Sequence, residues 1–294
     1  MGGESKDKSI SVVGLGNMGS ALAGGLLSSG FSIVVWNRTV SKATTLVERG
    51  ANLAQDVAAA ARSSNVMIIC VAEHSVIKSL LHNDDVAEAM CGKCLIQLGV
   101  VTAEEAQETA SWAQTHEIGY LEGSILGSPK SIAVGAATII CSGSREQYDD
   151  QKPILEVFGS PHHLSSSIGA AYQFDKMMYP FGYGATLGFV QGAAMAKASG
   201  YSIEAYTKIL LEWMKTLSGR LEDFGDLITN EDFTAYQATL EVWAAGYEKS
   251  LGLCRSLEVD DTLLKAHMAM LRKGVDEGYG EEEILAVYKT LLPE

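Results

Sequence analysis

The chain has 294 residues, of which 47% are hydrophobic and only five are proline, enough for two ordinary domains with a full apolar core. The formal net charge of −14 argues against nucleic acid and anionic membranes as partners, because both select a basic surface. No apolar run approaches the length of a membrane span, and the first eight residues show no signal-peptide pattern, so we expect a cytoplasmic protein.

The first predicted unit is a strand over 9–13, a glycine turn and a helix. In a GxGxxG turn, the first glycine allows a tight bend, the second lets backbone approach a pyrophosphate, and the third lets the helix pack closely. The helix N-terminus then offers free N–H groups to the phosphates. This pattern predicts a dinucleotide-binding fold, and a chance glycine turn is the alternative. The turn consists of Gly14, Leu15, Gly16, Asn17, Met18 and Gly19.

The end of the second strand, expected at Trp36, bears on the choice of cofactor. NAD-specific proteins usually place Asp or Glu there to accept a hydrogen bond from the ribose 2′-OH. This chain carries Asn37, Arg38 and Thr39, with Lys42 close behind. Arg38 can bind a 2′-phosphate with two parallel hydrogen bonds, and Lys42 adds a point charge. We therefore expect NADPH rather than NADH, and a solvated basic turn is the alternative.

Strands and helices are expected to alternate through the rest of the first half. Continuous apolar strands flanked by helices indicate a parallel sheet covered on both faces. Expected helices lie near 41–50, 57–62, 75–81, 85–90 and 102–114, and expected strands lie at 66–71, 94–98, 119–122 and 137–141. Thr102 is the expected N-cap of its helix, with Glu105 completing a capping box. Further candidate cofactor-binding residues are Cys70, Val71, Gly99 and Thr102.

From about residue 165 onward the pattern predicts helices alone. The first runs from Gly169 to Gly200 with Pro180 inside it, where we expect a kink or a local break. We predict a Rossmann-type NADPH-binding domain with a parallel sheet over 1–167, then an interdomain helix and an all-α domain over 168–294. A helix of about thirty residues spans about 45 Å, so part of its partner surface is expected from a second subunit. Further helices are expected at 202–219, 234–257, 262–278 and 281–292.

Cysteine and histidine spacing gives no sign of a metal site. The five cysteines are dispersed, which suits a reducing compartment. Cys91 and Cys94 form a CxxC pattern, but no second pair stands at zinc spacing. His162 and His163 follow Pro161 and are expected in a surface turn. We therefore expect no metal.

A nucleotide domain followed by one long helix and a helical tail resembles the 6-phosphogluconate and β-hydroxyacid dehydrogenase superfamily. The glycine turn and the Trp36-Asn37-Arg38-Thr39 run with Lys42 resemble NADPH-dependent imine reductases and reductive aminases, and the resemblance covers essentially the whole chain. It implies hydride transfer from NADPH to a cyclic imine, or reductive amination of a carbonyl plus an amine. It also implies a homodimer with shared active sites.

The opening of the long helix distinguishes the branches of this superfamily. β-Hydroxyacid dehydrogenases carry the pattern GxGxxxKxxxN there, and its Lys is the acid/base. Aligned on Gly169, the pattern places Asp175 at the Lys position and Tyr179 at the Asn position. Imine reductases carry Asp or Tyr at the Lys position, often followed eight residues later by Tyr-Gly, as at Tyr183 in this chain. A slip of one residue would instead place Lys176 at the Lys position.

The resemblance implies that Asp175 is a proton donor or a stabiliser of an iminium ion, and that Tyr183 donates a hydrogen bond to substrate or to Asp175. A harmless ion pair with Lys176 and a core tyrosine are the alternatives. Val100 stands where relatives commonly have a small polar residue. A β-hydroxyacid dehydrogenase-like oxidoreductase and a non-catalytic NADPH-binding dimer are the alternative functions. Candidate pocket residues are Val100, Tyr179, Trp213, Trp243 and Tyr247.

Overall fold

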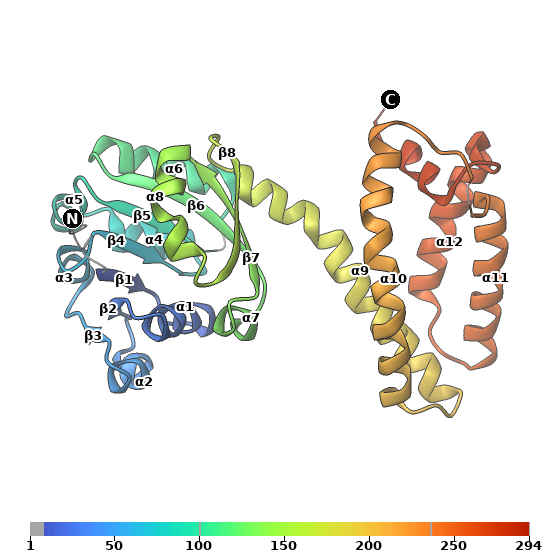
Figure 1. Cartoon of the computed structure of the whole chain (residues 1–294), viewed down its shortest axis with the longest axis horizontal. Coiled ribbons are helices and arrows are strands. Elements are labelled where there is room, and N and C mark those ends of the chain that lie inside the picture. The colour runs from blue at the N-terminus through green and yellow to red at the C-terminus, as the bar shows by residue number, and fades with distance from the viewer. Residues whose placement is uncertain (1–8, 100, 236, 294) are drawn as a thin grey trace, which may run out of the picture. The chain divides into compact units, whose positions relative to one another are not determined.

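The computed structural model describes residues 9–99, 101–235 and 237–293. The chain divides into two compact units, one ending at Tyr179 and the other beginning at Pro180. Each unit can be followed by its element labels in Figure 1.

The first unit alternates strands with helices, as the sequence predicts. Its strands are β1 (Ser9–Val13), β2 (Ser32–Trp36), β3 (Asn52–Leu53), β4 (Val66–Ile69), β5 (Cys94–Gln97), β6 (Gly119–Leu126), β7 (Ala137–Gly143) and β8 (Gly159–Ser165). Its helices are α1 (Asn17–Ser28), η1 (Val40–Ala43), α2 (Thr44–Glu48), α3 (Val57–Arg62), α4 (His74–Leu81), α5 (Asp84–Met90), α6 (Ala103–Thr115), α7 (Pro129–Ala133) and α8 (Arg145–Leu155).

The strands form one sheet in the order β3-β2-β1-β4-β5-β6-β7-β8. The predicted parallel sheet is confirmed from β3 through β6, and β7 pairs parallel with β8. It is wrong for β6 and β7, which run antiparallel. Their connection, 127–136, is shorter than the roughly dozen residues that a parallel crossover needs. The strand order reverses between β1 and β4, where ligands of such sheets usually bind.

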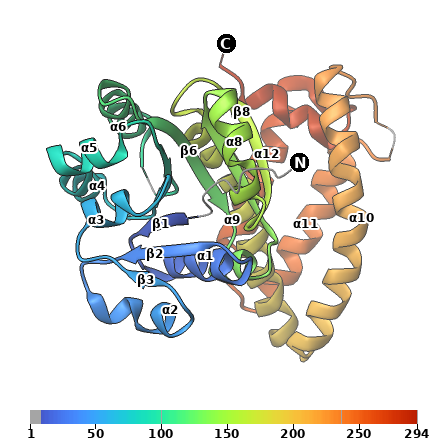
Figure 2. The same ribbon diagram turned by 60° about the vertical axis from the view of Figure 1, so that its left-hand side comes forward.

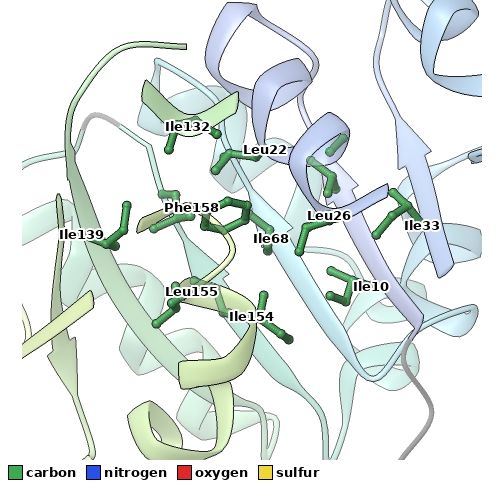
Figure 3. Close-up of a cluster of buried hydrophobic side chains, with 14 of the residues drawn as sticks. Ile10, Leu22, Leu26, Ile33, Ile68, Ile132, Ile139, Ile154, Leu155 and Phe158 are labelled. Carbon is green, nitrogen blue, oxygen red and sulfur yellow. The ribbon is translucent and has the colours of Figure 1, made fainter. Parts of the chain in front are cut away.

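Two hydrophobic clusters cover the two faces of this sheet. One packs α1 and α8 on the strands and contains Leu22, Leu26 and Ile68, as Figure 3 shows. The other packs α3 to α6 on the opposite face and contains Met67 and Ile69. Successive side chains of a strand point to opposite faces, and Met67, Ile68 and Ile69 of β4 are each 0% exposed. The uninterrupted apolar run of β4 is therefore explained by burial on both faces.

Four elements of the first unit have no counterpart in the predicted pattern: β3, α7, α8 and β8. Strand β8 contains His162 and His163, so the prediction of a surface turn is wrong. This edge strand alternates exposed and half-buried residues, so it lacks the continuous apolar run that marks the central strands. The predicted helix at 41–50 is a 3₁₀ turn followed by the short α2.

The second unit is helical, as predicted. It continues α9 (Ala170–Ala198) and adds α10 (Ile203–Thr229), α11 (Leu240–Ser256), α12 (Thr262–Gly274), η2 (Val275–Tyr279) and η3 (Ile284–Leu291). Helix α9 runs through Pro180 without a break. A small core of Leu251, Cys254, Leu264 and Met268 joins α11 to α12, which lie side by side in Figure 2. Among the described residues, no helix combines the length and apolarity that a membrane crossing requires.

Candidate active site

The GxGxxG turn at the end of β1 brings backbone segments into close contact. Gly14 has a φ of +95°, which favours glycine, and a Cβ there would lie 2.4 Å from the carbonyl oxygen of Cys70. A Cβ on Gly19 would lie 1.9 Å from the carbonyl oxygen of Gly14, so only glycine allows α1 to pack this closely. Gly16 differs, because its Cβ position has no atom within 4 Å and the residue is exposed. A ligand can therefore approach the backbone at Gly16.

The N-terminus of α1 is prepared for an anion. Among the described residues, no side chain caps this end, and the first turn of the helix holds no acidic residue. Its N–H groups and the positive end of its dipole are available to a phosphate. The turn therefore fits the pyrophosphate of a dinucleotide.

The residues after β2 divide into a structural part and an exposed part. The side-chain oxygen of Asn37 accepts a hydrogen bond from the Leu15 N–H at 2.9 Å, and its amide nitrogen donates to the Thr39 carbonyl at 3.0 Å. Asn37 thus ties the glycine turn to the following loop. Arg38 and Lys42 are exposed, and Lys42 borders a hollow together with Leu15 and other residues of the turn. Both cations are therefore accessible to a ligand that lies beside the glycine turn.

A pocket of about 320 Å³ opens beside the glycine turn, wholly within the first unit. The residues that follow β4 and β5, the second half of β6, and the first turns of α9 form its walls. Of the site residues predicted from the sequence, the following line this pocket: Gly16, Asn17, Met18, Gly19, Cys70, Val71, Gly99, Asp175 and Tyr179. The glycine turn and the opening of the long helix, more than 150 residues apart in the sequence, thus share one pocket.

Cys70 contributes volume to this pocket, not charge. Burial raises the pKa of its thiol to about 11, so the thiol is neutral at working pH. A neutral, half-buried thiol is a poor nucleophile. We therefore give Cys70 no chemical role in the pocket.

The start of α9 is held by two buried side chains of the sheet. Glu122 of β6 is 2% exposed, and its carboxylate accepts hydrogen bonds from the Gly169 N–H at 2.6 Å and the Tyr172 N–H at 3.1 Å. Ser142 of β7 donates its hydroxyl to Glu122 at 2.5 Å and accepts the Ala171 N–H at 3.2 Å. Together they satisfy three N–H groups that a helix start leaves without intrahelical partners. This clamp fixes the part of α9 that carries Asp175.

Asp175 lies one turn beyond this clamp and is 7% exposed. Its Oδ2 accepts a hydrogen bond from the Lys176 ammonium at 2.7 Å, and the same ammonium donates to the Tyr179 hydroxyl at 3.0 Å. The apolar residues next to Asp175 in the sequence do not surround it, since Met177 is 65% exposed and Phe174 is 36% exposed. The Lys176 ammonium is therefore a direct partner of this carboxylate.

Lys176 is a basic group under two opposing influences. Burial lowers the pKa of its ammonium, and the hydrogen bonds to Asp175 and Tyr179 raise it by more, so the net shift is upward. Lys176 therefore carries a positive charge throughout the physiological range. Lys176 and Asp175 thus form an ion pair in the pocket, and their charges sum to zero.

The remaining predicted residues have other surroundings. Thr102 accepts the Glu105 N–H at 3.3 Å and completes the predicted capping box of α6. Tyr183, on the part of α9 in the second unit, is 61% exposed, and Trp213 of α10 is also 61% exposed. Val100 lies outside the described residues.

Two predicted aromatic residues lie on α11 in the second unit. The Tyr247 hydroxyl lies 2.6 Å from Nδ1 of His267 on α12. Trp243 is half-buried, and its indole nitrogen lacks a hydrogen-bond partner among the described residues. Tyr247 thus has a structural contact, and its place in the substrate pocket stays a prediction.

Sequence reasoning did not anticipate several residues of the site. Tyr172 precedes Lys176 by four residues, so helical spacing alone could have placed both on one face. Glu122 also left a signal, because a carboxylate in an otherwise buried strand requires a partner. The partner itself, a helix start 47 residues away, has no sequence signature. Ser124 of β6, another pocket residue, has none either.

Comparison with known proteins covers both halves of the chain. Residues 9–170 match the NAD binding domain of 6-phosphogluconate dehydrogenase, and residues 167–293 match the C-terminal domain of NADPH-dependent reductive aminase-like proteins. An NADPH-dependent reductive aminase of Aspergillus oryzae is 28% identical over 284 residues, which are 95% of this chain and 96% of that protein.

Two solved structures show the same fold over almost the entire chain. The imine reductase from Myxococcus stipitatus in complex with NADP+ is 28% identical, with a TM-score of 0.86 over 97% of this chain and 100% of that one. A reductive aminase from Aspergillus terreus, in complex with NADPH4, cyclohexanone and allyl amine, is 27% identical with a TM-score of 0.87. That match covers 97% of this chain and 99% of the other.

Proposed function

Because the chain belongs to the imine reductase and reductive aminase family of NADPH-dependent oxidoreductases, we propose that it reduces the C=N bond of small imines to amines. The substrate is a cyclic imine, or an imine formed from a carbonyl compound and an amine. The observation that carries this proposal is the buried Asp175 carboxylate in a pocket that also contains the glycine turn. A carboxylate there suits a reaction that develops or consumes positive charge on nitrogen.

NADPH supplies the hydride when bound. We assign its pyrophosphate to the glycine turn and the N-terminus of α1, and its 2′-phosphate to Arg38 and Lys42. Asn37 supports this choice, because the neutral amide holds the turn in place without the negative charge that would repel a 2′-phosphate.

We assign the substrate nitrogen to Asp175. The carboxyl group either stabilises an iminium ion or donates a proton to the nitrogen, and both roles require it to reach the substrate from the wall of the pocket. We propose that Tyr183, Trp213, Trp243 and Tyr247 also contact the substrate.

A hydroxyacid dehydrogenase is the second candidate, because Lys176 also lines the pocket. A lysine base would suit the oxidation of an alcohol. Its ammonium, however, donates to Asp175 and Tyr179, and these bonds keep it protonated instead of available as a base. This favours imine reduction.

The wild-type enzyme tests the proposal directly. We expect it to oxidise NADPH in the presence of a pyrroline, and to do so with kcat/KM at least about tenfold higher than with NADH, the scale of one lost charge-assisted contact. Ketone plus amine mixtures test reductive amination in the same assay. Equal use of NADH would contradict the role of Arg38 and Lys42, and oxidation of hydroxyacids by NADP+ without imine reduction would establish the second candidate. Binding of NADPH with no turnover of any substrate would indicate a non-catalytic dimer.

We also propose a homodimer whose active sites combine residues of both subunits. Support comes from α10, whose 27 residues, all described, include none that is buried. Ile209, Leu211 and Trp213 on this helix are 60% exposed or more, and apolar surface of that extent usually marks an interface. Light scattering at micromolar concentration should give twice the mass of one chain, and Trp213→Glu should lower it toward one. A fully active monomer would contradict this assembly.

A further inference from the structure

The Lys176 ammonium has an unusually complete set of partners on one short stretch of α9. It donates to Asp175 Oδ2 at 2.7 Å and to the Tyr179 hydroxyl at 3.0 Å. It also lies 4.2 Å from the centre of the Tyr179 ring and 5.0 Å from the centre of the Tyr172 ring. A carboxylate, a hydroxyl and two aromatic faces therefore surround one cation.

Helical spacing explains why these groups meet. Tyr172 precedes Lys176 by four residues and Tyr179 follows it by three, so both rings lie on its face of the helix. The clamp of Glu122 and Ser142 holds the first turn of α9 against β6 and β7, which fixes the direction of this face relative to the sheet. The four side chains all line the pocket. The arrangement is thus part of the wall of the pocket.

We propose that Lys176 is a positioning residue that holds Asp175 as an ionised carboxylate with a fixed orientation, so that the pocket accepts the substrate as an iminium cation. This rests on the proposed function. An ammonium 2.7 Å from a carboxylate favours the charged form of that carboxylate. Asp175 then acts by stabilising positive charge on nitrogen, and it does not donate a proton to a neutral imine.

The chemistry balances without a proton from Asp175. The iminium nitrogen acquires its proton from water before or during binding. Hydride from NADPH adds to the iminium carbon, and the C=N π electrons return to nitrogen as the lone pair of the neutral amine. Lys176 keeps its three protons throughout.

Other titratable groups near Asp175 do not replace Lys176 in this role. Tyr172 and Tyr179 of α9 carry phenol groups, which supply no positive charge. Cys70, after β4, is held neutral by burial, which raises the pKa of its thiol. Glu122 of β6 supplies acceptor oxygens to the helix start and no positive charge. Among the described residues that line the pocket, Lys176 is thus the cation beside Asp175.

The test uses the pH dependence of kcat/KM on a permanently charged N-methyl cyclic iminium, whose own charge does not titrate. Lys176→Met removes the charge and retains most of the side-chain length. We expect the acidic limb of the kcat/KM profile of this variant to move to higher pH by about one unit or more, because Asp175 loses the nearby cation. Lys176→Arg should retain the wild-type profile. Lys152→Met on α8 is the matched control, because it also removes one lysine and its ion pair, with Glu156 at the end of that helix, but lies outside the pocket.

A second readout separates this inference from the proposed function. Carbon-13 NMR of labelled aspartate carboxyl groups, with Asp175→Asn for assignment, follows protonation in the NADP+ complex without any turnover. We expect Lys176→Met to move the Asp175 transition to higher pH, with NADP+ binding confirming that the variant folds. Unchanged transitions in NMR and in the rate profile would overturn the role of Lys176. Failure of the wild type to reduce any imine would refute the proposed function and leave the NMR result to decide the inference.

Discussion

We expect Asp175→Asn to lower kcat for imine reduction by about 100-fold or more, the usual scale for losing a positioned acid or a preorganised charge. The substitution preserves the shape of the side chain and removes its ionisable oxygen. The Kd for NADPH should change by less than about twofold, because Asp175 is assigned to the substrate and not to the phosphates. Stopped-flow measurement of NADPH oxidation and fluorescence titration of NADPH give the two quantities.

Two substrates reveal which role Asp175 has. If it stabilises positive charge, Asp175→Asn slows reduction of a neutral pyrroline and of its N-methyl iminium alike. If it donates a proton, only the neutral imine is slowed, since the N-methyl compound needs no proton. Asp149→Asn on the exposed face of α8 is the matched control and should retain wild-type rates. A near wild-type rate for Asp175→Asn, together with complete loss of activity in Lys176→Ala, would return the mechanism to a lysine acid/base.

The second large effect is expected for Glu122→Ala. This change removes a buried carboxylate that accepts hydrogen bonds from two N–H groups of α9 and from the Ser142 hydroxyl. Buried donors without partners cost about 1–3 kcal/mol each, so we expect a loss of about 3 kcal/mol or more in the stability of the first unit. Hydrogen exchange of the peptide 166–180 measures the local effect, and thermal unfolding measures the global one.

Two further variants separate loss of the clamp from a nonspecific loss of stability. Glu122→Gln retains one carbonyl acceptor and should lose less than half as much stability as Glu122→Ala. Glu156→Ala removes an exposed glutamate near the end of α8 and should change neither measurement. Normal exchange protection at the start of α9 in Glu122→Ala would show that Glu122 does not hold the helix. The rate of imine reduction should fall together with the hydrogen-exchange protection of the start of α9, because Asp175 lies one turn beyond the clamp.

Local patterns predicted most of the first unit because its signals are contained in short segments. Three glycines between an apolar strand and a helix are enough to indicate the glycine turn. The capping box of α6 needs only Thr102 and Glu105, three residues apart. Central strands such as β4 are apolar throughout, since both faces of the sheet are covered. Edge elements lack that signal, and so β8, which contains His162 and His163, was predicted as a turn.

The sequence by itself determined which residues could serve the chemistry: the glycine turn, the Asn37-Arg38 pair and an acidic residue at the opening of the long helix. Only the tertiary structure decided how they are held. The hydrogen bonds that Glu122 and Ser142 accept from N–H groups at a helix start 29 to 50 residues away follow no periodicity, so no local pattern indicates them. Asp175 and Lys176 are adjacent in the chain, so their ion pair could be anticipated as an alternative, and the structure shows it at 2.7 Å. The physical reason is that propensity and periodicity act over a few residues, whereas the electrostatic environment of a buried carboxylate is set by whatever the fold brings within a few ångströms of it.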